Sequence, residues 1–182
     1  WRRPPAVQRW AAERAQLITS VSRHTRRLFL KWANCSPESV RILPNTVSEH
    51  FTPGPKSDAL AERYGLRDKT VLLTVSRLAS AERYKGHDRV IRAVATLCAN
   101  HPEFVYVVAG DGDDKPRLEL LAKSLCIFDN VRFIGHVSDT DLPDLYRTAD
   151  IFVMPSSGEG FGIVFLQALA SGIPVIGGDS DG

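Results

Sequence analysis

We predict an α/β fold, an open parallel sheet with helices on both faces, from two features of the sequence. Short apolar segments rich in β-branched residues alternate with segments whose apolar residues recur at helical spacing. Such alternation is typical of βαβ units with right-handed crossovers. The segment 71–75 is apolar on both faces, as expected of a strand buried inside a parallel sheet.

The same patterns place the individual elements. Strands are predicted at residues 40–43, 71–75, 104–109, 131–134, 151–154 and 173–176. Helices are predicted at residues 22–33, 88–97, 118–125, 142–149 and 163–170, several of them preceded by Asp or Ser suited to capping. Pro and Gly cluster at residues 44–55, which we interpret as a linker. The segment before the linker is too small to bury its own core and should pack on something else.

Composition excludes several classes of protein. The 182 residues are 43% hydrophobic and 24% charged, so the chain is able to bury a core. A formal net charge of +2 is too balanced to indicate a nucleic-acid binder. No apolar run approaches the roughly 18 residues of a membrane span. The cysteines Cys35, Cys98 and Cys126 have no disulfide or zinc spacing, so we expect a cytoplasmic protein.

The charge is unevenly distributed. Residues 1–34 contain eight Lys and Arg against one Glu, a net charge of +7, which leaves −5 for the remainder. Such asymmetry is typical of contact with an anionic partner, for instance an acceptor at the inner face of a membrane. The alternative interpretation is a solvated helix face whose compensating acids belong to a neighbouring part of the protein.

Candidate site residues follow the predicted strand ends, where ligands of doubly wound sheets bind. Arg77 and Lys85 flank a loop after the strand at 71–75, and a pair of cations at a helix start suits a diphosphate. Surface cations in a loop are common, so solvated charges remain the alternative. Gly110 follows the strand at 104–109, where it permits a tight turn or a close approach to a ligand.

The turn after the strand at 151–154 is the most informative motif, with the sequence PSSGEGFGIV at residues 155–164. The first amides of the following helix, near Phe161 to Val164, have no partner within the helix and form an anion site. Glu159 would repel a phosphate there, so we predict that it accepts hydrogen bonds from sugar hydroxyls. Its alternative role is to complement the helix dipole. Gln167, two turns further on, either bonds a ribose diol or faces solvent.

These motifs together resemble the glycosyltransferase group 1 family, retaining enzymes of the two-domain GT-B fold that use nucleotide-diphosphate sugars. The resemblance rests on the segment from Pro155 to Ala168 together with residues 76–78, 85–86, 135–137 and 145–150. It implies that residues 47–182 are a Rossmann-like nucleotide-sugar-binding domain, the C-terminal half of the fold. Residues 17–22 and 41–47 resemble the end of the family's first domain and its crossover, which implies that residues 1–46 are a remnant of that domain.

The resemblance implies a role for each matching position. Arg77 and Lys85 would hold the diphosphate, and Glu159, the first acid of a Glu-seven residues-Glu pattern, would contact the donor sugar. The backbone around His136 and Val137 would line the base pocket. The remaining substrate-binding positions would be Ser76, Gly110, Gly160, Phe161, Gly162, Ile163, Val164 and Gln167.

Three departures from the family pattern affect these expectations. Gln167 replaces the second Glu, so weaker ribose binding or an altered donor is expected. Ser76 replaces a Gly, which we treat as tolerable. Nearly all of the first domain is absent, so we expect half an active site, with no transfer by this chain alone.

The expected chemistry is transfer of the sugar of a UDP- or GDP-sugar to an unidentified acceptor such as a lipid or a polysaccharide, with departure of the nucleoside diphosphate from the anomeric carbon. Fixed cations would stabilise the leaving diphosphate, so no metal or other cofactor is expected. Two alternatives remain open: a nucleotide-sugar epimerase or phosphorylase of the same architecture, and a non-catalytic α/β interaction module.

Overall fold

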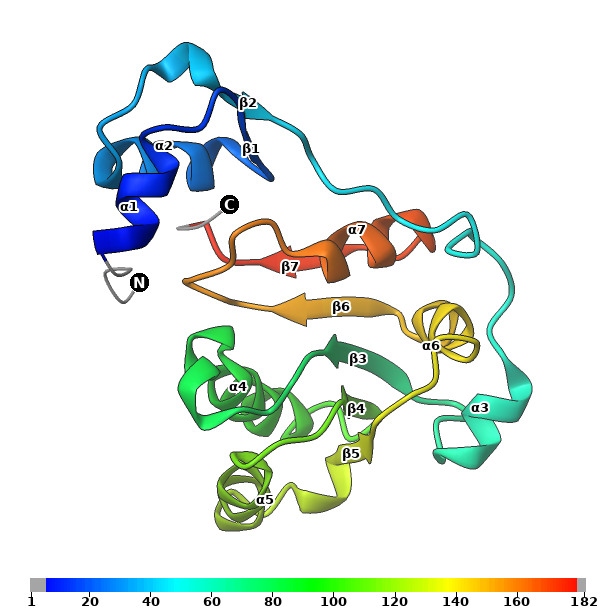
Figure 1. The fold of residues 1–182 in the computed structure, drawn as a ribbon. Coiled ribbons are helices and arrows are strands. Elements are labelled where there is room, and N and C mark those ends of the chain that lie inside the picture. The colour runs from blue at the N-terminus through cyan, green and yellow to red at the C-terminus, as the bar shows by residue number, and fades with distance from the viewer. Residues whose placement is uncertain (1–5, 180–182) are drawn as a thin grey trace.

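The computed structural model describes residues 6–179, which form a small N-terminal segment and a larger α/β domain joined by an extended linker (Figure 1). Arg2 and Arg3, two of the basic residues counted above, lie outside the described residues. No helix or strand occurs between Ile42 and Asp58. This stretch includes residues 44–55, where the sequence predicts a linker.

The larger domain contains a five-stranded parallel sheet in the order β5-β4-β3-β6-β7. Its strands are β3 (Thr70–Val75), β4 (Phe104–Ala109), β5 (Val131–Gly135), β6 (Ile151–Met154) and β7 (Val175–Gly177). From β3 the chain builds outward through β4 to β5, then returns to the other side of β3 to build β6 and β7. The direction of winding therefore reverses between β3 and β6, and this pair of strands is the topological switch point of the sheet.

Helices cover both faces of the sheet, as predicted. One core lies beneath α3 (Asp58–Arg63), α6 (Leu142–Thr148) and α7 (Ile163–Ala170), and is centred on the aromatic side chains of Tyr146 and Phe152. The other core lies beneath α4 (His87–Cys98) and α5 (Lys115–Ser124), where Ile91, Val94 and Leu118 are fully buried. The buried strands thus contribute side chains to two cores, which explains their apolar residues on both faces.

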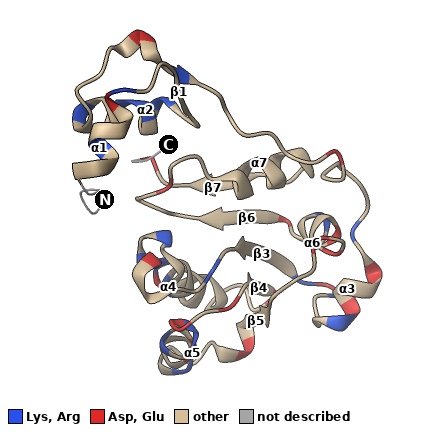
Figure 2. Cartoon of the chain, viewed as in Figure 1, with Lys and Arg blue, Asp and Glu red and all other residues tan. Residues whose placement is uncertain are grey.

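The N-terminal segment has its own two-stranded parallel sheet, formed by β1 (Ile18–Ser20) and β2 (Val40–Ile42). Helices α1 (Ala6–Ala12) and α2 (Arg23–Trp32) pack beside it, and neither contains a buried residue. As expected, the segment packs on another part of the chain: the Ser22 and Thr25 hydroxyls both donate hydrogen bonds to the Gly160 carbonyl, at 2.6 and 2.9 Å. Lys and Arg concentrate on this segment, whereas both signs mix over the larger domain (Figure 2).

Several elements differ from the sequence prediction. The short elements α1, β1 and α3 were not predicted, because three to seven residues give too little periodicity to detect. Helix α5 begins at Lys115 rather than at 118, since Pro116 occupies the first turn, where its missing N–H costs nothing. Strand β7 begins at Val175 rather than at 173.

Candidate functional site

The switch point brings together the two segments that the sequence singled out. Ser76 and Arg77 directly follow β3, and the 155–162 turn directly follows β6. Because β3 and β6 are adjacent and parallel, their carboxyl ends lie at the same edge of the sheet. The edge chosen from the motifs is therefore the edge at which doubly wound sheets hold their ligands.

A pocket of about 380 Å³ opens at the carboxyl ends of β3, β4 and β5. Six predicted site residues line it: Ser76, Arg77, Gly110, His136, Val137 and Val164. The first two follow β3, Gly110 follows β4, the next two follow β5, and Val164 lies in the first turn of α7. Strand ends far apart in the sequence thus converge on one hollow.

Gly110 owes its identity to a contact within the protein. Its φ is 131°, and a Cβ atom at this position would lie 1.9 Å from the Ser76 carbonyl oxygen. A side chain would therefore push the β3 end away from the β4 end. The close backbone approach foreseen from the sequence is here an approach between two walls of the pocket.

Arg77 and Lys85 meet on one carboxylate, that of Glu82, for which the sequence suggested no role. Arg77 Nη2 pairs with Glu82 Oε1, and Lys85 Nζ lies 3.0 Å from Glu82 Oε2. The 3-10 turn η2 (Ser80–Lys85) folds the loop back so that these three side chains converge. The Arg77 side chain is 77% exposed and lines the pocket, whereas that of Lys85 is only 12% exposed.

The end of η2 packs directly on the turn that follows β6. The Ser157 amide donates a hydrogen bond of 3.0 Å to the Tyr84 carbonyl. Gly86, with a φ of 80°, lies so close to Pro155 that a Cβ atom would come within 2.8 Å of the Pro155 carbonyl oxygen. The loop that contains both cations and the turn that contains Glu159 therefore form one continuous rim.

Glu159 lines a second hollow, of about 630 Å³, between this rim and helix α2. Tyr84 and Gly160 line it from the larger domain, and His24 and Thr25 line it from α2. The predicted residues that line a hollow are thus divided between two, the first with Arg77 and the second with Glu159. The other predicted residues line neither of them, namely Lys85, Phe161, Gly162, Ile163 and Gln167.

Helix α7 begins at Ile163, close to where the sequence placed its first amides. Gly162 precedes it with a φ of 70°, and a Cβ atom there would lie 2.4 Å from the Phe165 ring, so only glycine fits this turn. Gln167 does not simply face solvent, because its Oε1 accepts a hydrogen bond of 3.0 Å from the Tyr146 hydroxyl. Its amide oxygen is thereby held in a fixed position.

Two buried polar groups support the rim and were not identified from the sequence. Asp114, 3% exposed, pairs with Arg83 of η2 at 3.1 Å and with Arg117 of α5 at 2.6 Å. The bonds to Arg117 and Arg83 hold the pKa of the Asp114 carboxyl below its usual range, despite burial. Asp114 therefore fixes the position of η2 as a charged group.

His87 is the second of these groups. It is 5% exposed at the start of α4, and its Nε2 lies 2.8 Å from the Ser76 hydroxyl. Burial, helped by the nearby Lys85 ammonium, lowers its pKa from 6.5 to about 4. The imidazole is therefore neutral at physiological pH.

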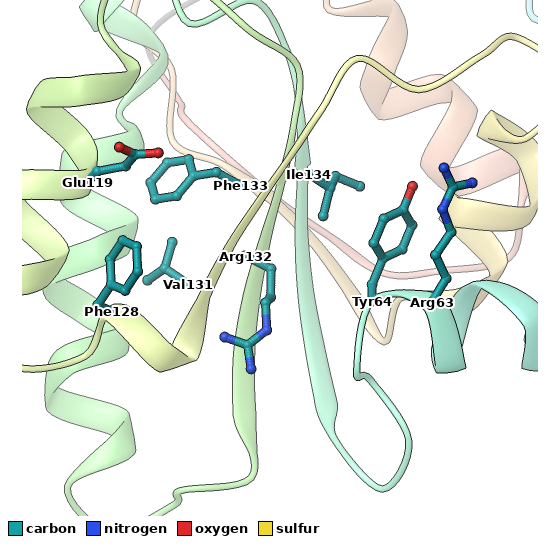
Figure 3. A pocket seen from close by; sticks show the side chains of 8 residues that line it. All are labelled: Arg63, Tyr64, Glu119, Phe128, Val131, Arg132, Phe133 and Ile134. Carbon is teal, nitrogen blue, oxygen red and sulfur yellow. The ribbon is translucent and has the colours of Figure 1, made fainter.

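A third hollow, of about 430 Å³, lies at the β5 edge of the sheet (Figure 3). It is lined by aromatic and charged side chains, among them Tyr64, Phe128 and Arg132, and by none of the predicted site residues. Among residues 6–179, no group of three or more His, Cys, Asp or Glu could hold a metal ion. Within the same range no helix is long and apolar enough to cross a membrane.

The fold defines a doubly wound α/β protein with a pocket at the carboxyl ends of its central strands. Residues 57–182 match the family model described as glycosyl transferases group 1, and the chain belongs to this family. The sheet and its covering helices are those of a GT-B glycosyltransferase, as the solved structures show. The resemblance found in the sequence is confirmed.

Among curated proteins, the chain is 35% identical over 176 residues to a GDP-mannose-dependent alpha-(1-6)-phosphatidylinositol monomannoside mannosyltransferase of Mycolicibacterium smegmatis. This match covers 92% of the chain and 45% of that protein. Among solved structures, Anabaena HepE in complex with UDP and glucose superposes with a TM-score of 0.85 at 25% identity, with 97% of this chain and 48% of that chain covered. WaaG, a glycosyltransferase of lipopolysaccharide biosynthesis, gives 0.79 at 27% identity, with 95% and 49% covered. The chain thus spans about half the length of the relatives it matches.

Proposed function

We propose that this chain is the donor-binding part of a retaining glycosyltransferase that takes a UDP- or GDP-sugar. The observation behind this proposal is the continuous rim at the switch point. Arg77 and Lys85 share Glu82 there, and η2 packs on the turn that contains Glu159. The relatives support the donor class, since one is named for GDP-mannose and another was solved with UDP and glucose.

In the proposed mechanism the nucleoside diphosphate leaves the anomeric carbon, and negative charge grows on the leaving phosphate. Arg77, Lys85 and the first amides of α7 stabilise that charge by fixed electrostatics. The Glu159 carboxylate accepts hydrogen bonds from hydroxyls of the donor sugar. His136 and Val137 face the base from the β5 end of the pocket. The proposal invokes no metal or organic cofactor.

We further propose that residues 1–46 belong to a first domain that supplies acceptor-binding groups and part of the cleft. Large apolar side chains are exposed on this segment, namely those of Val7, Trp10, Leu17, Ile42 and Leu43. The rest of the chain, in contrast, buries most of its large apolar side chains. Such a surface suits a domain contact. The relatives, about twice as long as this chain, are consistent with a second half of that size.

The basic face of the N-terminal segment suits an anionic acceptor, such as a lipid headgroup at a membrane surface. One relative is named for a phosphatidylinositol mannoside acceptor. The proposed acceptor class is therefore a lipid or a polysaccharide.

The test of the donor site is calorimetric titration of the chain with GDP and with UDP. One of the two should bind, and Arg77→Ala and Lys85→Ala should each weaken it roughly 10- to 100-fold, because a hydrogen bond to a charged phosphate is lost. Arg132→Ala, at the β5 edge, is the matched control and should leave the affinity unchanged. Binding of neither nucleotide, or binding that ignores both substitutions, would refute the assignment.

Transfer activity provides a separate check. Because the acceptor side of the cleft is proposed to lie in the first domain, the chain alone should hydrolyse or transfer no sugar above background when GDP-mannose or UDP-glucose is supplied. Turnover by this chain alone would show that the second half is dispensable and would contradict the proposed division of the cleft.

A further inference from the structure

A chain of hydrogen bonds runs from the backbone of β6 to the rim of the first pocket. The Thr74 hydroxyl donates to the Val153 carbonyl, and the Tyr106 hydroxyl lies 2.8 Å from Thr74 Oγ1. His87 Nδ1 lies 3.2 Å from the Tyr106 hydroxyl, and His87 Nε2 lies 2.8 Å from the Ser76 hydroxyl. Every member except Ser76 is buried, with Tyr106 fully so.

The first link fixes the direction of all the others. A carbonyl oxygen only accepts, so the Thr74 proton points at Val153. Thr74 has no second proton, and Tyr106 must therefore donate to it. The Tyr106 oxygen is left as an acceptor, so the hydrogen that bridges it to His87 is carried by Nδ1.

The protonation state of His87 then determines which partner donates in the hydrogen bond between His87 and Ser76. The buried imidazole is neutral, so it has a single N–H, which is already assigned to Nδ1. Nε2 is then an acceptor, and the Ser76 hydroxyl donates to it at 2.8 Å. The other acceptor near Ser76, the Arg77 carbonyl, is farther away at 3.2 Å. If Ser76 donated to that carbonyl, two lone pairs would face each other at 2.8 Å.

We infer that Ser76 is a specificity-determining residue that presents only hydrogen-bond acceptor capacity to the pocket. It therefore selects a donor group of the bound nucleoside, a hydroxyl or an N–H, and disfavours a phosphate oxygen. Ser76 lines the pocket beside Arg77, so the two neighbours divide the ligand: the guanidinium takes the phosphate and the hydroxyl takes a ligand donor. This inference rests on the proposed function, since it names what the same pocket recognises.

His87, Tyr106 and Thr74 act through Ser76 and are positioning residues. They lie behind the pocket wall, and none of them lines the pocket. Their arrangement costs the burial of several polar groups, and every one of these groups finds a partner in the chain of bonds. The orientation of one rim hydroxyl is thereby tied to the backbone of the central strands.

The first test needs no substitution. Long-range ¹H–¹⁵N NMR of the chain at neutral pH distinguishes the two histidine tautomers, and His87 should carry its proton on Nδ1. Tyr106→Phe removes the acceptor for that proton and should shift it to Nε2, which then donates to Ser76. A proton on Nε2 in the unmodified chain would overturn the inference.

The second test separates the two classes of ligand group. Ser76→Ala should weaken binding of GDP or UDP, whichever the chain prefers, by about three- to tenfold, the value of one hydrogen bond. Binding of inorganic pyrophosphate, which has no hydroxyl or N–H donor of the nucleoside, should not weaken. Ser124→Ala is the matched control, because that hydroxyl donates to Leu121 at the end of α5 and does not line the pocket.

The outcomes distinguish this inference from the proposed function. Equal weakening of nucleotide and pyrophosphate would show that Ser76 donates to phosphate, and unchanged binding of both would show that it contacts neither. Each result overturns the inference while leaving the donor site intact. If the unmodified chain bound neither nucleotide, the proposed function would fail, and the tautomer of His87 would still decide whether Ser76 is free to donate.

Discussion

The larger domain and the N-terminal segment differ in how much of their apolar surface they bury. In the larger domain two cores bury apolar side chains from strands and helices, whereas in the described part of the N-terminal segment only Ser20, Ala33 and Val40 are buried. That segment carries an excess of positive charge and exposes Trp10 and Leu17. Because apolar burial is the main stabilising term, the larger domain should hold nearly all of the folding free energy.

The larger domain and the N-terminal segment also differ in how they are fixed at the candidate site. In the larger domain, strands fixed by burial position the rim residues at the switch point, and the buried Asp114 holds η2 in place. The N-terminal segment contacts the rim through two hydroxyls that donate to one carbonyl, and its helix α2 lines the second hollow together with the rim. Because the N-terminal segment has few buried residues, we expect it to open more readily than the larger domain with its two cores.

The largest effect that tests this contrast is expected in the core. Phe152 is fully buried, with ring centroids 5.8 Å from Tyr146 and 5.5 Å from Phe165. Phe152→Ala should lower the free energy of unfolding by about 3–5 kcal/mol, since it leaves a cavity. Trp10→Ala, at a side chain that is 57% exposed, should change it by less than about 0.5 kcal/mol. Urea denaturation followed by circular dichroism measures both, and equal losses would contradict the contrast.

The next effect is a pH dependence located in the larger domain. The pKa of His87 is lowered from 6.5 to about 4 on folding, so the unfolded chain binds this proton more readily. The contribution of the neutral His87 imidazole to the free energy of unfolding is fully present above pH 6.5 and is lost as the pH falls toward 4. The loss amounts to about 3 kcal/mol. The charged groups that act on it are Lys85, Asp88, Asp114 and Arg117.

Urea denaturation at pH 6.5 and at pH 4 measures this loss. The His87→Gln variant has no titrating group at this position. Between pH 6.5 and pH 4 its free energy of unfolding should therefore fall by about 3 kcal/mol less than that of the unmodified chain. Asp114 does not obscure the comparison, because its pKa lies below the ordinary range and its ion pairs persist to lower pH. Parallel losses in the two proteins would show that His87 is not buried as a neutral group.

Much of the fold was predictable because its signals are local. The strand at 71–75 was recognised from its continuous apolar residues, and β3 differs from that prediction by a single residue. The missed strand β1 depends on pairing with β2, across more than twenty residues of sequence, and its three residues carry no pattern of their own. The order of the strands, and hence the switch point, likewise depends on contacts that no local pattern encodes.

The site shows the same limit. Arg77 and Lys85 were found because they follow a recognisable strand, and the structure brings them together. Glu82, which joins them, was missed because its role depends on the fold of η2. His87 was missed because its partner Tyr106 lies on a different element, strand β4, whereas His87 begins helix α4. A functional role defined by a long-range contact leaves no trace in the spacing of residues.

The smallest expected effect concerns the attachment of the N-terminal segment. Thr25→Val keeps the shape of the side chain but removes the hydroxyl that donates to Gly160 at 2.9 Å. Ser22 is the less suitable target, since its hydroxyl also accepts from the Thr25 amide and caps α2. Loss of one hydrogen bond should weaken the attachment by about 0.5–1.5 kcal/mol.

Hydrogen exchange measured by mass spectrometry should therefore be faster in α2 and at residues 157–162, and unchanged in β3 and β4, because only the attachment is loosened. Thr96→Val is the matched control: its hydroxyl bonds within α4, at the Arg92 carbonyl, so neither segment should respond. Faster exchange throughout the sheet would mean that the N-terminal segment stabilises the larger domain, and the two parts would then form one cooperative unit. Unchanged exchange in α2 would show that the two hydroxyls are not what holds the segment at the rim.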